Sequence, residues 1–262
     1  MAERTCPAGS VRVGVDVTSI ADVDAAVAAF GQRYVTRLFT DQEIESCGAA
    51  APHGGTTASL AARFAAKEAV LKVLEPSGSR PRWRDIEVVR RPSGACRIRL
   101  HGRAASLAAA RGVDAMSVSL SHEAGLAVAV VAAACEPGRP PGAAGHHAGC
   151  RDRGDGRDDD RDPTSNQRGR RKTAMTITEE TTGRIRDVLA EHGRLPVDVS
   201  LLSEDDDLFQ AGMTSHASVN VMLALEDAFD VEFPEAMLRK TTFASIGALH
   251  RAIAQLAQGE PA

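Results

Sequence analysis

Two acidic side chains occur where apolar ones are expected, and together they could hold a divalent cation. Asp16 interrupts the alternating run over residues 11–17, which is typical of a strand. Glu68 lies beside the apolar stripe of a helix that begins near Thr57. A buried carboxylate must be paired, protonated or bound to a cation. Because Mg²⁺ is typically bound by one or two carboxylates together with substrate phosphates, Asp16 and Glu68 are candidate Mg²⁺ ligands.

The helix by itself offers a simpler interpretation of Glu68. Glu68 and Lys72 are four residues apart, and such pairs are common on helix surfaces, where each contributes about 0.2–0.5 kcal/mol. Lys67 falls on the apolar stripe itself, where it could pair with a neighbouring acid. The helix alone favours the surface pair, and the acid in the strand is what shifts the interpretation toward a metal site.

Three sequence blocks in the front half of the chain occur together in one enzyme family. They cover residues 14–17 (Gly-Val-Asp-Val), 63–69 (Arg-Phe-Ala-Ala-Lys-Glu-Ala) and 119–122 (Ser-Leu-Ser-His). With these blocks the chain resembles the holo-acyl-carrier-protein synthases, which are 4′-phosphopantetheinyl transferases. The resemblance spans residues 11–134. The order of the expected elements predicts an α+β transferase domain over residues 1–135, with helices on a small antiparallel sheet.

The resemblance implies a phosphoryl transfer. A 4′-phosphopantetheine arm would move from coenzyme A to a serine hydroxyl, with release of adenosine 3′,5′-bisphosphate. A hydroxyl that attacks a phosphorus surrounded by negative oxygens needs charge neutralisation and alignment above all. By analogy with the family, Asp16 and Glu68 would hold Mg²⁺ against the diphosphate of the coenzyme. A carboxylate or a bound water would accept the serine proton.

Basic side chains are the remaining candidates for this site. Lys72 matches a family lysine that neutralises phosphate oxygens, so it is a candidate for catalysis and for coenzyme binding. Arg63 is a candidate contact of the 3′-phosphate, because a guanidinium fork suits that geometry. Lys67 is a further candidate contact of the coenzyme. His122 could cap a turn or could contact phosphate or the surroundings of the metal, and the family match favours the second role.

The middle and the end of the chain differ in composition from the front. Over residues 136–174 Arg, Asp, Gly and Pro dominate and almost nothing apolar remains, which predicts a disordered linker. The net charge is +3 over residues 1–135, +2 in this segment and −9 over residues 175–262. A mildly basic front and a strongly acidic back favour attraction between the two over nucleic-acid binding.

Residues 175–262 have the pattern of a small helical domain. Amphipathic runs predict helices over residues 178–192 and 246–256 and another that ends near Phe229, which fits an all-α four-helix bundle with one long crossing loop. Residues 207–215 (Asp-Leu-Phe-Gln-Ala-Gly-Met-Thr-Ser) resemble the attachment site of acyl carrier proteins. The resemblance implies a carrier domain with 4′-phosphopantetheine bound covalently to Ser215.

Ser215 also has a simpler interpretation, because serine and threonine are common N-caps of helices. The acidic loop before it, the apolar helix after it and a transferase upstream favour the attachment site. Two neighbours depart from the family pattern, since Thr214 replaces the usual Asp and His216 the usual Leu. The local sequence is more similar to that of specialised carrier proteins, including aminoacyl carriers, than to that of the carriers of fatty-acid synthesis.

The front half shows departures of its own. Ser19 and Asp22 occupy the positions where the family has a Glu and then an Arg that contacts the acidic helix of the carrier. Matching departures in both halves fit a transferase tuned to its own fused carrier. They also leave an alternative open, in which the front lobe is catalytically inactive and docks or presents a carrier domain that another enzyme modifies. Intact Asp16 and Glu68 argue against that alternative.

The remaining features concern location and partners. The first four residues lack the apolar core of a signal peptide, and the longest apolar run, residues 125–135, is too short to span a bilayer. Five cysteines without a CxxC pair favour free thiols. We therefore expect a cytoplasmic protein without nucleic-acid or membrane partners. The expected partners are coenzyme A, the chain's own carrier and other apo carrier proteins, and the family implies a homotrimer with active sites between subunits.

Overall fold

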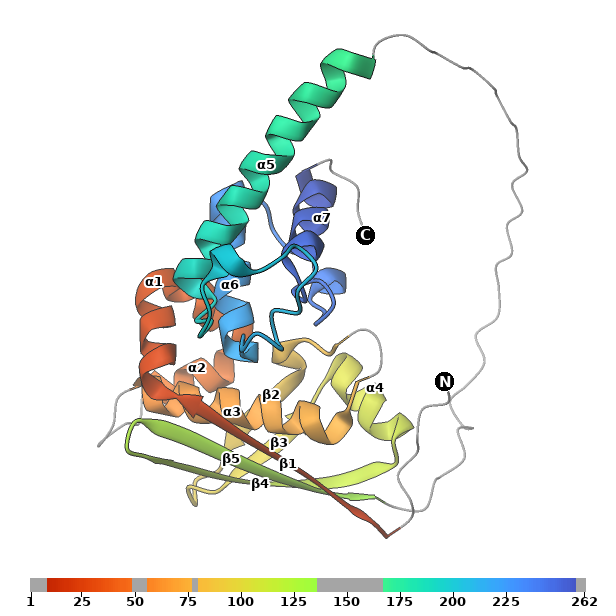
Figure 1. Ribbon diagram of the computed structural model, residues 1–262. Helices are drawn as coiled ribbons and strands as arrows, with labels where there is room; N and C mark the ends of the chain where they lie inside the picture. The colour runs from red at the N-terminus through yellow and green to blue at the C-terminus, as the bar shows by residue number, and fades with distance from the viewer. Residues whose placement is uncertain (1–8, 49–55, 77–79, 136–166, 258–262) are drawn as a thin grey trace, which may run out of the picture.

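A computed structural model describes residues 9–48, 56–76, 80–135 and 167–257, which form two lobes (Figure 1). The predicted linker lies mostly outside these ranges. Its last residues, from Gln167 onward, already belong to a helix. Among the described helices, none is both long enough and apolar enough to cross a membrane.

The front lobe combines helices with two small antiparallel sheets, which confirms the predicted α+β class. The larger sheet has the strand order β1-β5-β4, and β2 and β3 form a separate hairpin. The strands are β1 (Val11–Ser19), β2 (Ile86–Arg90), β3 (Cys96–Leu100), β4 (Val113–Glu123) and β5 (Leu126–Cys135). The helices are α1 (Ile20–Leu38), α2 (Asp41–Gly48), α3 (Thr56–Leu74) and α4 (Gly102–Ala110).

Helix α3 lies directly on the larger sheet and sets the position of the acid in β1. Alternate residues of β5, from Ala127 to Ala133, are buried on the face that this helix covers. On β1 the approach is so close that a Cβ atom on Gly14 would lie 2.0 Å from the carbonyl oxygen of Ala69. Because side chains alternate along a strand, Asp16 emerges on the same face as Gly14. The missing side chain at position 14 therefore brings Asp16 alongside α3.

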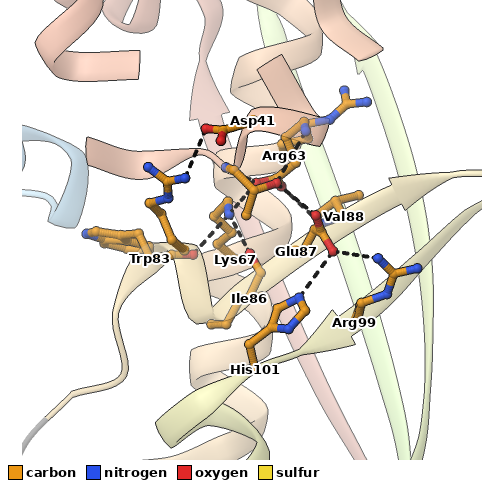
Figure 2. A network of polar contacts seen from close by, with 12 residues as sticks. Asp41, Arg63, Lys67, Trp83, Ile86, Glu87, Val88, Arg99 and His101 are labelled. Atoms are coloured by element: carbon orange, nitrogen blue, oxygen red, sulfur yellow. Dashed lines mark hydrogen bonds and ion pairs between the residues drawn. The ribbon is translucent and has the colours of Figure 1, made fainter. Parts of the chain in front are cut away.

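A buried polar network joins α2, α3 and the β2–β3 hairpin (Figure 2). The amide of Thr40 donates to Oε2 of Glu43 at 2.9 Å and the amide of Glu43 donates back to Thr40 Oγ1, which forms a capping box at the start of α2. Lys67 of α3 is fully buried and its Nζ lies 2.8 Å from the same Glu43 oxygen. Lys67 also donates to the carbonyl oxygens of Trp83 and Ile86. The network thus anchors the middle of α3 from the side opposite the sheet.

The back lobe is helical, and its core is formed by apolar side chains from every segment. Its helices are α5 (Gln167–His192), α6 (Ser215–Phe229) and α7 (Ile246–Ala257). These are three of the four helices expected, and two short 3₁₀ turns, Val199–Leu201 and Glu235–Met237, lie in the connecting segments. Fully buried side chains include Ile185, Leu189, Leu208, Leu223 and Phe233.

The cysteines of the described residues are not all alike. Cys47 and Cys96 have free thiols, and burial raises the pKa of the Cys47 thiol. Cys135, the last residue of β5, is disulfide-bonded. The expectation of free thiols is therefore wrong for Cys135.

Candidate active site between the two lobes

The two lobes meet along α1 and α6, and opposite charges face each other there. Arg33 of α1 pairs with Glu226 of α6 at 3.1 Å, and Arg37 lies 3.4 Å from the same carboxylate. A further pair joins Asp22 of α1 to Arg194, which follows α5. The two contacts of Glu226 have the polarity expected from the basic front and the acidic back, whereas the Asp22–Arg194 pair has the reverse polarity. Because Glu226 is only 6% exposed, Arg33 and Arg37 balance a buried carboxylate, and removing them would leave its charge unpaired.

Ser215 is the first residue of α6, but it is not the residue that caps the helix. Thr214 holds the N-cap position, and its Oγ1 accepts from the amide of Ala217 at 3.1 Å. The hydroxyl of Ser215 is therefore available for other contacts. Its side chain lies close to the carboxylate of Glu68 in the other lobe, near enough to lower the pKa of that carboxyl group.

A cavity of about 390 Å³ surrounds this contact, and both lobes contribute to its walls. Its lining is rich in cationic side chains. The front lobe supplies Lys72, Arg80 and Arg82, and the back lobe supplies Arg239 and Lys240. A cleft that combines several cations with a serine and a single carboxylate is suited to a polyanionic substrate.

Asp16 and Lys72 form one side of the site. The Nζ atom of Lys72 lies 2.9 Å from Oδ1 of Asp16 and also donates to the carbonyl oxygen of Val15 at 2.6 Å. Thr18 contacts the other carboxylate oxygen, Oδ2, at 3.3 Å. Lys72 thus pairs with the acid in the strand, and the Glu68–Lys72 surface pair suggested by the helix pattern does not form.

Glu68 forms the other side of the site, and its environment works against its negative charge. The residue is only 6% exposed, and this burial raises the pKa of its carboxyl group. Arg80, whose Nη2 lies 2.6 Å from Oε1, opposes that effect, whereas the nearby charge of Asp16 adds to it. The net result is a pKa above the ordinary value. Glu68 is therefore a better proton acceptor than an exposed glutamate.

The two carboxylates fit a divalent cation. They lie close enough for Asp16 to raise the pKa of Glu68, although Lys72 and Arg80 already balance part of their charge. A cation between them would relieve this repulsion. Among the described residues no group of three or more His, Cys, Asp or Glu side chains could hold a metal. A site with two carboxylates and otherwise water or substrate oxygens matches the preference of Mg²⁺.

Three of the sequence candidates lie away from this cavity. Lys67 is fully buried and its ammonium group is engaged by the network of Figure 2. Arg63 is also buried, and it donates to the carbonyl oxygen of Ser59 and to the hydroxyl of Ser46. His122 is exposed on β4, opposite Ala127 of β5. The expected coenzyme contacts of Lys67 and Arg63 therefore have no support in this placement.

The structure adds Arg80 and Trp83, which the sequence did not single out. Arg80 holds Glu68, and its guanidinium group also stacks on the Trp83 ring, with its carbon 4.5 Å from the ring centre. Both residues line the cavity. A signal for them was present, because Trp83 is the only tryptophan in the chain and arginines flank it at positions 80, 82 and 84.

Two family models match the chain, one in each lobe. Residues 12–131 match the 4′-phosphopantetheinyl transferase superfamily. Residues 184–253 match the phosphopantetheine attachment site. The first range contains Asp16, Glu68 and Lys72, and the second contains Ser215.

Individual proteins are similar to one lobe or the other. A holo-[acyl-carrier-protein] synthase of Moorella thermoacetica is 42% identical over 112 residues, which are 43% of this chain and 84% of that protein. One of Desulforudis audaxviator is 41% identical over 45% of this chain and 87% of its own length. The back lobe is similar to an aminoacyl carrier protein of Agrobacterium fabrum, at 42% identity over 30% of this chain and 94% of that protein.

Proposed function

The chain belongs to the holo-[acyl-carrier-protein] synthase family of 4′-phosphopantetheinyl transferases, and we propose that it modifies the carrier lobe that it contains. In this proposal the front lobe transfers 4′-phosphopantetheine from coenzyme A to Ser215. The observation that carries the proposal is that Ser215 of the back lobe and Glu68 of the front lobe line the same cavity, whose walls are rich in cations.

The proposed reaction forms a bond between the Ser215 oxygen and the phosphorus next to the pantetheine. The bond from that phosphorus to the bridging oxygen of the diphosphate breaks, and adenosine 3′,5′-bisphosphate leaves. Glu68 accepts the serine proton, as its raised pKa favours. Lys72 and Arg80 lie in the cavity where they can neutralise phosphate oxygens. Bound Mg²⁺, held by Asp16 and Glu68, would supply further neutralisation of the diphosphate.

The group carried on the arm is proposed to be an amino acid. The support is the similarity of the back lobe to a protein named aminoacyl carrier protein, over nearly the whole length of that protein. Residues 212–215 (Gly-Met-Thr-Ser) also support an aminoacyl carrier, because their sequence is similar to that of specialised carriers. Other apo carriers are proposed as additional acceptors.

The direct test is a mass spectrum of the full apo chain incubated with coenzyme A and Mg²⁺. We expect the mass of one phosphopantetheine to be added, and we expect Ser215→Ala to abolish the addition. Ser218→Ala is the matched control, because Ser218 also lines the cavity but uses its hydroxyl to donate to the Ser215 carbonyl oxygen at 2.7 Å. An adduct that persists in Ser215→Ala would contradict the proposed attachment site.

A homotrimer is proposed for the assembled protein. The outer face of the larger sheet, opposite α3, exposes a row of valines, and no described helix covers it (Figure 1). Val11 and Val13 are 66% and 61% exposed, and Val15, Val17, Leu126 and Val130 extend the same apolar surface. An apolar patch of this kind marks an interaction surface. His122 is exposed on β4, so in a trimer it could contribute to the site of a neighbouring copy.

Substitutions on this sheet face should disperse the trimer. We expect Val13→Lys to shift the mass in sedimentation equilibrium from three chains to one, because a buried lysine without a partner opposes association. Leu201→Lys is the control, since Leu201 is 82% exposed in the back lobe, away from the sheet. A wild-type chain that sediments as a monomer, or an unchanged assembly in Val13→Lys, would overturn the proposed interface.

A further inference from the structure

His216, the residue after the modified serine, is a buried polar group that the proposed transfer chemistry does not use. Its ring lies against two aromatic side chains of the front lobe. The Nε2 atom is 2.7 Å from the hydroxyl oxygen of Tyr34 on α1, and the ring of Phe64 on α3 lies edge-on at 5.1 Å. His216 is 7% exposed, and Tyr34 and Phe64 are 0% and 1% exposed. We call this pair of front-lobe residues, Tyr34 and Phe64, the His216 socket.

Both partners of the hydrogen bond, Tyr34 and His216, are neutral. Burial raises the pKa of Tyr34 far above neutrality. Burial also lowers the pKa of His216 to about 4, with Asp22 acting in the opposite direction and Arg194 in the same direction. A single hydrogen atom therefore joins the Tyr34 oxygen to the histidine nitrogen. Because both atoms are removed from water, each depends on the other as its hydrogen-bond partner.

The charged groups near His216 come from both lobes and balance each other. Asp22 lies on the same helix as Tyr34, and Arg194 comes from the loop after α5. These two form an ion pair. Phe64, the contact from α3, has no charge. The socket is therefore a buried aromatic site, and it has no unpaired charge that could stabilise an ionised side chain of the carrier.

We propose that the His216 socket selects carriers by the residue that follows their serine. It favours a neutral hydrogen-bonding ring such as that of His216. This inference rests on the proposed function. A carrier with an aliphatic residue at this position would leave the Tyr34 hydroxyl buried without a partner. A carrier with a charged residue would bring an unpaired charge into the same place. Buried unpaired groups of either kind are a common means of rejecting wrong partners.

A double-mutant cycle in the full chain tests the selection. We expect His216→Leu to slow self-modification by roughly tenfold to a hundredfold, because the Tyr34 hydroxyl loses its partner. Adding Tyr34→Phe removes that hydroxyl, so the double variant should regain most of the lost rate. The control His250→Leu makes the same change on α7 and should leave the rate unchanged. Equal rates for wild type and His216→Leu, or losses that simply add in the double variant, would overturn the socket.

A second measurement does not depend on phosphopantetheine transfer. In the docked chain the His216 ring should titrate by NMR near pH 4, and in Tyr34→Asp, where the socket contains a charge, it should return toward its ordinary pKa of 6.5. Docking lowers the pKa of His216, so the free energy that favours docking of the two lobes is lost as the pH falls from 6.5 toward 4. A wild-type chain that titrates near pH 4 but forms no adduct would contradict the proposed function and leave the socket intact. A wild-type value near 6.5 would contradict the socket.

Discussion

Removing the charge of Asp16 or of Glu68 is expected to slow the transfer of phosphopantetheine to Ser215 by about 10²–10³-fold, the usual cost of deleting one electrostatic contact to a transition state. Asp16→Asn and Glu68→Gln preserve size and the contacts to Lys72 and Arg80 as far as an amide can. Glu68→Gln also removes the proton acceptor next to the serine hydroxyl. The rate is measured in a single turnover of the full apo chain with coenzyme A and Mg²⁺, followed by mass spectrometry.

The matched control for these variants is Glu75→Gln. Glu75 is a glutamate of the same lobe, but its side chain is 63% exposed and it pairs with Arg12 and Arg111 outside the cavity. Its loss should leave the rate within about twofold, since exposed pairs contribute little. An unchanged rate in Asp16→Asn and Glu68→Gln would leave the front lobe without a catalytic role. The alternative, a front lobe that only docks or presents the carrier, would then be favoured.

Many elements of this protein can be predicted from the sequence because their apolar residues recur with a clear strand or helix period. The alternation over residues 11–17 and the amphipathic runs over residues 178–192 and 246–256 each fall within an element of the predicted type. Prediction of the site was also helped by spacing. Gly14 and Asp16 share one face of β1, so the close approach that glycine permits brings the acid to α3.

The errors of prediction come from partners that lie far away in the sequence. Lys67 and Arg63 look like cations that are free to bind a coenzyme, since the helix pattern gives no sign that α2 and the β2–β3 hairpin cover that side of α3. Helical spacing alone suggested a pair between Lys72 and Glu68, and that alternative fails because β1 supplies Asp16 as the partner of Lys72. The His216 socket could not be predicted, because its residues belong to different lobes that only the docked structure brings together.

The buried network at Lys67 leads to the largest expected change in stability. Lys67→Met keeps the volume of the side chain but leaves the Glu43 carboxylate buried without its cation, and such losses usually cost about 3–5 kcal/mol. Denaturation followed by the fluorescence of Trp83 reports on this lobe, since it holds the only tryptophan in the chain. Lys72→Met is the control on the same helix. Its side chain is 52% exposed and its pair with Asp16 should contribute about 0–1 kcal/mol.

The pair should also show coupling when both partners are changed. Glu43→Gln removes the charge but keeps an oxygen that can accept from the amide of Val88, which donates to Glu43 at 3.0 Å. In the double variant Lys67→Met/Glu43→Gln no unpaired charge remains, so we expect about 1–3 kcal/mol of the loss to be regained relative to the sum of the single changes. If Lys67→Met costs no more than Lys72→Met, or the two losses simply add, the ion pair is not what anchors α3. The position of Glu68, the next residue along that helix, would then depend on the sheet alone.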